Sequence, residues 1–368
     1  MKHWILLILF LIFMMPVRAE ELPEVSAKSA IVLEYTGGTV VYAKNAEERL
    51  PMASTTKIMT ALVALEKGVL SDTVTVGANA AGVEGSSMYL RQGEKLTLEE
   101  LLYGLMLTSG NDAAVAISEH IAGSEAAFAE MMTARAVELG CTNTRFKNAN
   151  GLPDEEHYTT ALELARITGK ALENETFRKI VSSQSVRIGN RTLSNHNKLL
   201  SLYEGAIGVK TGFTKAAGRT LVSAAERGGI TLIAVTLNAP DDWDDHAKML
   251  DYGFSCMEKR CVTEKGGYAG TLRVEGGTED SVELCFGETF SLSVLKTAET
   301  EVKINLPSGV QAPVSAGTVL GTGEIFANNV KMGEVPLLAS AAVEEQYIPT
   351  FRDYLQLVFS RWVTMYIK

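Results

Sequence analysis

The sequence predicts an α+β fold in which a sheet flanked by helices is followed by a small all-β domain and a C-terminal amphipathic helix. Three observations carry this prediction. Two sets of β-rich runs enclose a helical middle in the first 260 residues, short alternating segments follow, and the last 22 residues form one amphipathic run. A chain of 368 residues exceeds what one hydrophobic core usually organises, so we expect two domains.

Residues 1–19 have the layout of a secretory signal peptide. Lys2 precedes an apolar run of 14 residues that ends at Val17, and we expect cleavage after Ala19. The run is shorter than the roughly 20 residues that a membrane-spanning helix needs, although an uncleaved N-terminal anchor is the alternative. Loss of Lys2 and Arg18 changes the formal net charge from −10 to −12, and an acidic mature chain argues against a nucleic-acid partner.

The first folded domain is predicted over residues 20–260. Its opening segment "SAIVLEYTGGTVVYA" contains two β-rich runs around a glycine pair, which is a hairpin pattern. Thr97, Ser124 and Thr160 each stand where a helix N-cap is expected, ahead of amphipathic runs. Between residues 206 and 237, three apolar runs are separated by glycines, as in neighbouring strands. This order of elements predicts a three-layer domain.

Residues 261–344 are predicted to form the small all-β domain. Segments such as "TLRVEG", "SVELCFG" and "EVKINL" alternate polar and apolar residues between turn residues. The turns are acidic and polar and show no catalytic grouping, so we expect a spacer or docking role.

Residues 345–368 are predicted to form the amphipathic helix. Its polar residues recur every four positions along one side: Arg352, Gln356, Ser360, Thr364 and Lys368. The remaining face is wide and rich in aromatic residues, so the helix is expected to lie in the headgroup region of a membrane. A terminal helix docked on the protein itself is the alternative.

Four cysteines are too few for a disulfide scaffold in a chain of this length. Neither a Cys-x-x-Cys motif nor a His-rich cluster suggests a metal site, and the five histidines are scattered. We interpret the cysteines as structural or free, with free buried thiols favoured.

Ser54 and Lys57 lie three residues apart in "PMASTTKIMTA", where a helix is predicted to begin. Residues at this spacing share one helical face, so the lysine amine can reach the serine hydroxyl. A serine becomes an effective nucleophile when a base takes its proton, and a lysine can be that base once burial and neighbours lower its pKa. Taken alone, the Ser-x-x-Lys spacing is weak evidence for a catalytic pair, since the same spacing recurs at Ser293 and Lys296.

Two further groups, Ser109-Gly110-Asn111 and Lys210-Thr211-Gly212, each occur once. On a tight turn between helices, a hydroxyl can relay protons and an amide can bind a substrate carbonyl. The alternative for the first group is an ordinary helix N-cap. At a strand edge, a lysine can hold a carboxylate and a glycine lets a ligand approach the backbone closely. The alternative for the second group is a polar strand terminus followed by a turn.

These groups follow the order Ser-x-x-Lys, Ser-x-Asn and Lys-Thr-Gly of penicillin-binding proteins and class A β-lactamases. Longer phrases, among them "LLYGLMLTSGNDAAVAISE", "NANGLPDEEHYTTALELARIT" and "GVKTGFTKAAGRTLVSAAERGG", resemble the serine-type D-alanyl-D-alanine carboxypeptidases, the low-molecular-mass penicillin-binding proteins. The resemblance covers essentially the whole mature chain, because that family also carries a C-terminal β domain and often an amphipathic C-terminal anchor. It implies a β-lactamase/transpeptidase-like three-layer domain, with no cofactor and no metal.

The resemblance also implies a substrate and a set of roles. The substrate is a peptidoglycan stem peptide ending in D-Ala-D-Ala, and β-lactams are acylating inhibitors. Lys57 would take the proton of Ser54, which attacks the penultimate D-Ala carbonyl, while the backbone N–H groups of Ser54 and Phe213 hold the oxyanion. Ser109 and Lys210 would pass a proton to the departing nitrogen, and a water would then hydrolyse the acyl-enzyme. The implied substrate-binding residues are Asn111, Lys210, Thr211, Gly212, Phe213 and Thr214.

The anchor for the terminal carboxylate is less clearly defined by the resemblance. Thr211 and Thr214 would bind it together with a cation, but the family's frequent arginine near "DDWDDHAK" is absent, and Arg219 is the candidate in its place. His157 lies where the family commonly shows a histidine near the site; a surface-loop histidine is the alternative. We interpret Trp243 as an aromatic plug in a solvated acidic loop, with a place at the substrate rim as the alternative.

Three rival functions remain open. A β-lactamase or a DD-endopeptidase would use the same residues, although "NANGLPDEEHYTT" resembles the carboxypeptidase segment; Glu155 and Glu156 are present in it. A non-catalytic wall-binding or antibiotic-sensing protein predicts damage to at least one motif, and none is visible. The favoured hypothesis is an exported enzyme that is held peripherally at the outer face of a bacterial cytoplasmic membrane.

Overall fold

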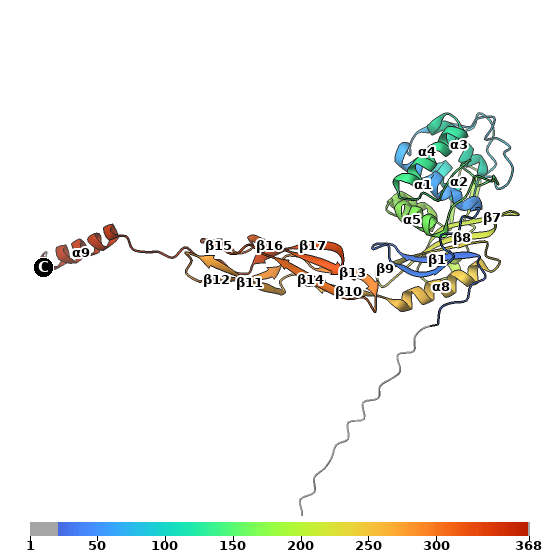
Figure 1. The fold of residues 1–368 in the computed structure, drawn as a ribbon. Helices are drawn as coiled ribbons and strands as arrows, with labels where there is room; N and C mark the ends of the chain where they lie inside the picture. The colour runs from blue at the N-terminus through green and yellow to red at the C-terminus, as the bar shows by residue number, and fades with distance from the viewer. Residues whose placement is uncertain (1–20, 367–368) are drawn as a thin grey trace, which may run out of the picture. The chain divides into compact units, whose positions relative to one another are not determined.

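The computed structural model describes residues 21–366, so the predicted signal peptide lies outside the described residues (Figure 1). The described residues divide into two compact units. The first comprises residues 21–32, 42–224 and 234–253, and the second comprises residues 33–41, 225–233 and 254–366.

A five-stranded sheet in the order β2-β1-β9-β8-β7 forms the centre of the fold that carries the motifs. Its strands are β1 (Ser29–Glu34), β2 (Val40–Lys44), β7 (Ala206–Thr214), β8 (Gly218–Arg227) and β9 (Ile230–Leu237). The predicted hairpin joins β1 to β2, and Gly38 has a φ of +68° in its turn, a conformation that glycine adopts without strain. All residues of β9 are buried, as expected of a central strand covered on both faces.

Helices cover both faces of this sheet (Figure 1): α1 to α5 lie over one face and α8 over the other. The helices are η1 (Ala53–Thr56), α1 (Lys57–Lys67), α2 (Leu98–Leu107), α3 (Asn111–Ala122), α4 (Glu125–Glu138), α5 (Ala161–Leu172), α6 (Glu175–Ser182), α7 (Leu199–Leu202) and α8 (Asp242–Cys256). Two short hairpins pair β3 (Thr73–Thr75) with β4 (Lys95–Thr97) and β5 (Ser185–Ile188) with β6 (Arg191–Ser194). The predicted three-layer α+β architecture is confirmed.

The predicted helix starts are also confirmed by their caps. The Thr97 hydroxyl accepts from the Glu100 N–H, and the Glu100 carboxylate accepts from the Thr97 N–H, which completes a capping box. Ser124 caps α4. Thr160 accepts from the Glu163 N–H at the start of α5, but the Glu163 carboxylate turns away from its own helix to accept from the Asn143 N–H. Thr160 therefore caps α5 as predicted, whereas the Glu163 carboxylate stabilises a tertiary contact and does not cap its own helix.

The segment "DDWDDHAK" is helical, so the interpretation of Trp243 as part of a solvated loop is wrong. It forms the start of α8, and Asp242 and Asp245 are each only 2% exposed. The Asp245 carboxylate accepts from the N–H and hydroxyl of Ser26 and from the Ala27 N–H. Buried carboxylates of this kind need such donors, and a local sequence window does not reveal them.

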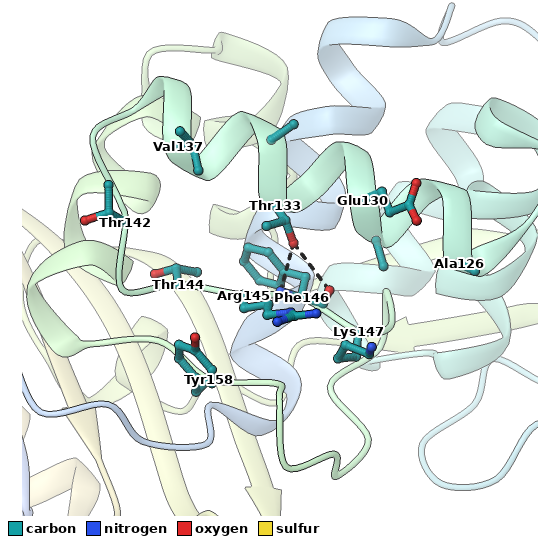
Figure 2. Close-up of a pocket in the computed structure, with 12 residues that line it drawn as sticks. Ala126, Glu130, Thr133, Val137, Thr142, Thr144, Arg145, Phe146, Lys147 and Tyr158 are labelled. Atoms are coloured by element: carbon teal, nitrogen blue, oxygen red, sulfur yellow. Dashed lines mark hydrogen bonds between the residues drawn. The ribbon is translucent and has the colours of Figure 1, made fainter.

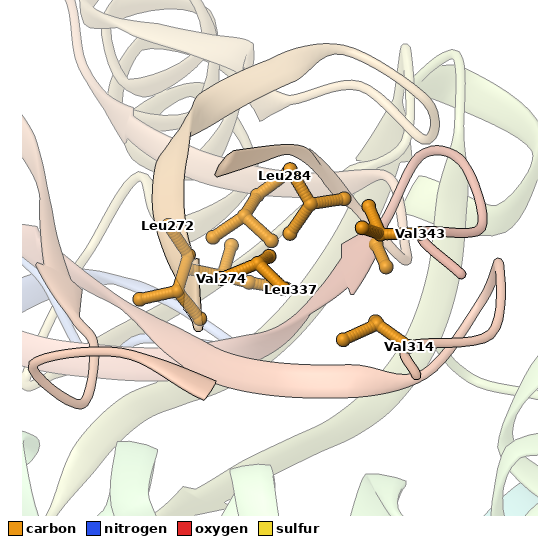
Figure 3. Close-up of a cluster of buried hydrophobic side chains, with 8 residues drawn as sticks. Leu272, Val274, Leu284, Val314, Leu337 and Val343 are labelled. Atoms are coloured by element: carbon orange, nitrogen blue, oxygen red, sulfur yellow. The ribbon is translucent and has the colours of Figure 1, made fainter. Parts of the chain in front are cut away.

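The second unit contains the predicted all-β region. Its strands are β10 (Met257–Thr263), β11 (Tyr268–Glu275), β12 (Ser281–Phe286), β13 (Phe290–Leu295), β14 (Thr300–Asn305), β15 (Val310–Gln311), β16 (Val319–Ala327) and β17 (Val330–Ala339). β10 pairs with β13, and the others form a sheet in the order β14-β16-β17-β12-β11-β15. Apolar side chains that alternate along these strands meet in a buried cluster (Figure 3), which includes Leu272, Val274, Leu284 and Leu337.

The C-terminal helix α9 (Phe351–Tyr366) is present as predicted, and its large apolar side chains are exposed. Phe359, for example, is 67% exposed and Trp362 is 59% exposed. Within residues 21–366, none of the helices combines the length and the apolar character needed to cross a membrane.

The four cysteines, all of which lie within the described residues, form no disulfide bond with one another. Cys141 is buried, and burial raises the pKa of its thiol to about 12. Cys261 is exposed, so the expectation of a buried thiol is wrong for this residue.

Candidate active site

The three sequence motifs meet at one cleft with a volume of about 410 Å³. It is lined by Ser54, Ser86, Ser109, His196, Lys198, Thr211, Gly212, Phe213, Arg219, Asp242 and Trp243. Five of the predicted site residues are in this set. Lys57, Asn111 and Lys210 are buried. The Lys57 amine contacts Ser54 and Asn111, and the Lys210 amine donates to the Thr211 carbonyl. Thr214 is not part of the lining, and its hydroxyl accepts from the Ala217 N–H.

Ser54 lies in the short helix η1, and Lys57 is the first residue of α1. The Lys57 Nζ atom lies 3.0 Å from Ser54 Oγ, so the predicted reach between amine and hydroxyl is realised. The Thr220 hydroxyl on β8 donates to the Met52 carbonyl at 3.1 Å and ties η1 to the sheet. The serine and the lysine are therefore held by the core of the first unit.

Two carbonyl oxygens fix the direction of the Lys57 amine. Nζ donates to Asn111 Oδ1 at 2.8 Å and to the Asn150 carbonyl at 2.5 Å. A neutral amine has two N–H donors and one lone pair. With both donors used by oxygens that can only accept, the lone pair is left to face Ser54 Oγ.

The electrostatic surroundings favour that neutral amine. Complete burial, and then the charge of Lys210, hold the pKa of Lys57 well below its usual value, with Asp112 and Glu125 opposing in part. Burial also lowers the pKa of Lys210 to about 7. A lysine with a depressed pKa can take a proton from a hydroxyl near neutral pH.

The Ser109-Gly110-Asn111 turn connects α2 to α3, and Ser109 has a φ of +60°. The N-cap of α3 is Gly110 and has no side-chain cap, so the N-cap alternative for this motif is wrong. The Asn111 side chain joins Lys57 to the preceding loop, because Nδ2 donates to the Glu84 carbonyl at 2.6 Å. A serine in the left-handed region is a strained residue of the kind found at functional sites.

Lys210-Thr211-Gly212 lies within β7, and Lys210 is 1% exposed, so this motif is not a polar strand terminus. A Cβ atom on Gly212 would lie 2.9 Å from Ser54 N and would overlap the Thr220 hydroxyl. Glycine is therefore required for β7 to pass this close to η1.

Sequence reasoning missed several lining residues. His196 and Lys198 come from "SNHNKLL", a segment without any recognisable motif, and Ser86 comes from the loop before α2. Asp242 enters through the first turn of α8, which also brings Trp243 to the cleft, the position expected by the substrate-rim alternative for that residue. The approach of Ser86, His196, Lys198 and Asp242 to the cleft depends on tertiary packing alone, so no local pattern could have revealed these residues.

Arg219 reaches the cleft as suggested, but its guanidinium is already engaged. Nε and Nη2 contact Asp242 Oδ1 at 2.9 and 2.8 Å, and the guanidinium carbon lies 5.8 Å from the Trp243 ring centroid. These contacts fix the direction in which Arg219 presents its charge to the cleft.

Glu155 and Glu156 do not line the cleft. The Glu156 carboxylate forms ion pairs with Arg145 at 2.9 Å and Lys147 at 3.1 Å, and both glutamates are exposed. Neither is placed to direct a deacylating water. His157 is 3% exposed, which excludes the surface-loop alternative for this residue.

A larger cavity of about 610 Å³ lies beside α4 and holds none of the predicted site residues (Figure 2). In it, the Thr133 hydroxyl contacts the backbone N–H and carbonyl of Phe146 at 3.0 and 3.3 Å. These contacts fix the segment that runs from Thr144 through Lys147, but they bring no nucleophile next to a base. Volume therefore does not identify the reactive site here.

Comparison with known proteins agrees with this geometry. A family model described as D-alanyl-D-alanine carboxypeptidase matches residues 16–241, and one described as penicillin-binding protein 5, C-terminal domain, matches residues 258–345. The D-alanyl-D-alanine carboxypeptidase DacF of Bacillus subtilis is 36% identical over 352 residues, which cover 91% of this chain and 90% of the relative.

Two solved structures extend the comparison. Penicillin binding protein 5 from Haemophilus influenzae superimposes with a TM-score of 0.68 at 29% identity, covering 89% of this chain and 100% of the other. A mutant of the Streptomyces K15 DD-transpeptidase gives a TM-score of 0.61 at 35% identity, covering 63% of this chain and 99% of the other. From the assembled motifs and a family match that spans more than half of its length, the chain belongs to the D-alanyl-D-alanine carboxypeptidase family.

Proposed function

We propose that this protein removes the terminal D-alanine from peptidoglycan stem peptides through an acyl-enzyme on Ser54. The observation that carries the proposal is the buried Lys57 amine, 3.0 Å from Ser54 Oγ and oriented by Asn111 and Asn150. The neutral amine takes the hydroxyl proton as Ser54 Oγ attacks the penultimate D-Ala carbonyl.

The backbone N–H groups of Ser54 and Phe213 bind the oxyanion of the tetrahedral intermediate. The close passage of Gly212 beside Ser54 N supports this assignment, because it brings the Lys-Thr-Gly strand next to the nucleophile's own amide. An oxyanion hole of two backbone donors can contribute several kcal/mol of barrier lowering, since losing one such donor costs roughly 3 kcal/mol.

Collapse of the intermediate breaks the peptide bond and requires a proton on the departing nitrogen. Ser109 and Thr211 line the cleft, and the Lys210 amine donates to the Thr211 carbonyl, so we assign this transfer to the Ser109 hydroxyl with protonated Lys210 as the associated cation. Asn111 keeps the Lys57 amine aligned in the free enzyme and is proposed to orient the acyl chain. A water then attacks the ester and releases Ser54.

The terminal carboxylate is proposed to bind at the Thr211 end of the cleft. Thr211, Lys198 and Arg219 all line this cleft, and their donors suit a carboxylate. Because Asp242 already neutralises part of the Arg219 charge, Lys198 is the additional cation we assign to this subsite. Thr214 stays a prediction for the same role.

The test is to incubate the purified mature protein with a peptide ending in D-Ala-D-Ala and, separately, with benzylpenicillin. We expect release of free D-alanine and a slowly decaying covalent adduct on the peptide that contains Ser54. Rapid turnover of benzylpenicillin without an adduct would favour a β-lactamase, and cleavage only of cross-linked dimers would favour an endopeptidase. Absence of both reactions would favour the non-catalytic alternative.

We further propose that the mature enzyme is exported and held at the outer face of the bacterial cytoplasmic membrane by α9. Exposed apolar side chains such as Phe359 and Trp362 support binding in the headgroup region. Residues 20–260, 261–344 and 345–368 are proposed to act as catalytic domain, spacer and membrane-binding helix.

A chain that ends at Gln346 is expected to keep full activity on soluble peptide and to lose binding to vesicles that contain phosphatidylglycerol. The apolar side chains of α9 are exposed, so the fold does not depend on them. Flotation of vesicles with bound protein is the measurement. Phe359→Asp on the apolar face should release the full chain, and Ser360→Asp on the polar stripe adds the same charge and should not. Loss of soluble activity on truncation would contradict the role assigned to α9.

A further inference from the structure

A chain of hydrogen bonds runs from the buried imidazole of His157 to the peptide bond that precedes Ser54. The Lys147 N–H donates to His157 Nδ1 at 3.1 Å, and His157 Nε2 lies 2.7 Å from the Thr56 hydroxyl. That hydroxyl donates to the Ala53 carbonyl at 2.8 Å. Both side chains are buried, so water does not compete for these contacts.

The direction of every bond in this chain can be deduced. Nδ1 accepts a backbone N–H, so in the neutral imidazole the proton resides on Nε2 and is donated to Thr56 Oγ1. The single hydroxyl proton of Thr56 is then free to point at the Ala53 carbonyl. Phe146, whose ring meets the imidazole edge to face at 5.7 Å, fixes the plane of the ring.

The Ala53 carbonyl, which is the last acceptor in this series of hydrogen bonds, belongs to the same peptide unit as the Ser54 N–H. In a trans peptide, C=O and N–H point in opposite directions, so a bond that fixes the Ala53 carbonyl also fixes the direction of the Ser54 N–H. Ala53 has a φ of +49°, a region that costs a residue with a side chain free energy unless its surroundings hold it there.

Two glycines border this peptide and leave it little freedom. A Cβ atom on Gly151 would overlap the Ala53 carbonyl oxygen, and one on Gly212 would lie 2.9 Å from Ser54 N. The backbone is therefore packed on both sides, and the Thr56 hydroxyl supplies a directed contact to its carbonyl end.

We propose that His157 and Thr56 are positioning residues that hold the Ala53–Ser54 peptide so that the Ser54 N–H points at the oxyanion. Neither touches the substrate; both act through the orientation of a backbone donor. The inference rests on the proposed acyl-enzyme function and adds the device that sets up one half of its oxyanion hole.

The charges around His157 agree with a neutral imidazole. Burial, opposed in part by the charge of Asp154 and assisted by Lys57, lowers the pKa of His157 to about 4. Among the other charged groups near the ring, Glu156 is paired with Lys147 at 3.1 Å and with Arg145 at 2.9 Å, and Glu155 is exposed to solvent. A protonated ring would also place an N–H against the Lys147 N–H, so the neutral tautomer is the one that completes the chain.

The test compares Thr56→Val with Thr56→Ser in the full mature chain, using the rate of acylation by benzylpenicillin over a range of concentrations. Valine keeps the shape and removes the donor, so we expect the limiting rate to fall about 10- to 100-fold while the half-saturating concentration changes little. Serine restores the hydroxyl and should restore the rate. His157→Phe keeps the Thr56 donor but removes the contact that orients it, so it should lose part of the same rate. The double variant should be no slower than Thr56→Val, because both residues act through one carbonyl.

Thr168→Val is the matched control. Its buried hydroxyl donates to the Leu164 carbonyl at 2.7 Å on α5, away from the cleft, so it loses the same kind of bond without reorienting Ser54. A wild-type limiting rate in Thr56→Val, or an equal loss in Thr168→Val, would overturn the inference while wild-type acylation stood. If the wild-type protein formed no adduct, the proposed function would fail first and this inference with it.

Discussion

Ser54→Ala is expected to abolish the benzylpenicillin adduct and to lower D-alanine release by about 10⁴-fold or more, the scale seen when a catalytic nucleophile is removed. The reason is specific to this hydroxyl: it lines the cleft and has the oriented Lys57 amine 3.0 Å away. The measurement is intact mass over time, followed by peptide mapping of any adduct. Thermal unfolding should be close to that of the wild type, because the change deletes one partly exposed hydroxyl.

The chain supplies its own control for this experiment. Ser293 and Lys296 repeat the Ser-x-x-Lys spacing, but Ser293 lies on strand β13, where the i to i+3 spacing does not place two side chains on one face. Ser293→Ala should therefore leave adduct formation unchanged. An adduct that persists in Ser54→Ala and maps to Ser109 would show that the wrong serine has been assigned as nucleophile.

Elements with a strong local signal could be predicted from the sequence. The hairpin at the glycine pair, the Thr97–Glu100 capping box and the glycine-separated strands from 206 to 237 depend on turn, cap and period, which are properties of short windows. The same holds for Ser54 with Lys57, since a pair three residues apart on a nascent helix needs no distant partner to meet.

What the sequence could not reveal depends on contacts between distant segments. Asp242 and Asp245 were predicted to be solvated because four aspartates surround one tryptophan. Both carboxylates are buried instead: Asp242 contacts Arg219, and Asp245 accepts from the N–H groups of Ser26 and Ala27. His157 looked equally able to be a surface residue, and its burial beside Thr56 appears only when residues 101 apart are brought together. His196 and Lys198 reach the cleft without a motif.

The second large effect is expected at Lys57. Lys57→Met keeps the length of the side chain and removes the base, so acylation by benzylpenicillin should slow by about 10³-fold, within the usual range for loss of general-base catalysis. Ser54 would remain in place without an acceptor for its proton. The rate lost in this variant should be partly regained as pH rises, since hydroxide can then replace the missing amine. The measurement is the acylation rate from pH 5 to 10, with thermal unfolding used to verify folding.

The pH dependence of the acylation rate of the unmodified enzyme is an independent test of Lys57 as the base. Acylation needs the neutral amine, so its rate should rise with pH through the pKa of Lys57, which burial and the Lys210 charge hold below the usual lysine value. Lys210→Gln removes a positive charge that opposes protonation of Lys57. The pKa of Lys57 should then rise. The rise in acylation rate on the acid side of the pH profile should therefore move to higher pH, even if the maximal rate also falls. If the acid side of the pH profile stays in place or moves to lower pH, a group other than Lys57 takes the proton from Ser54.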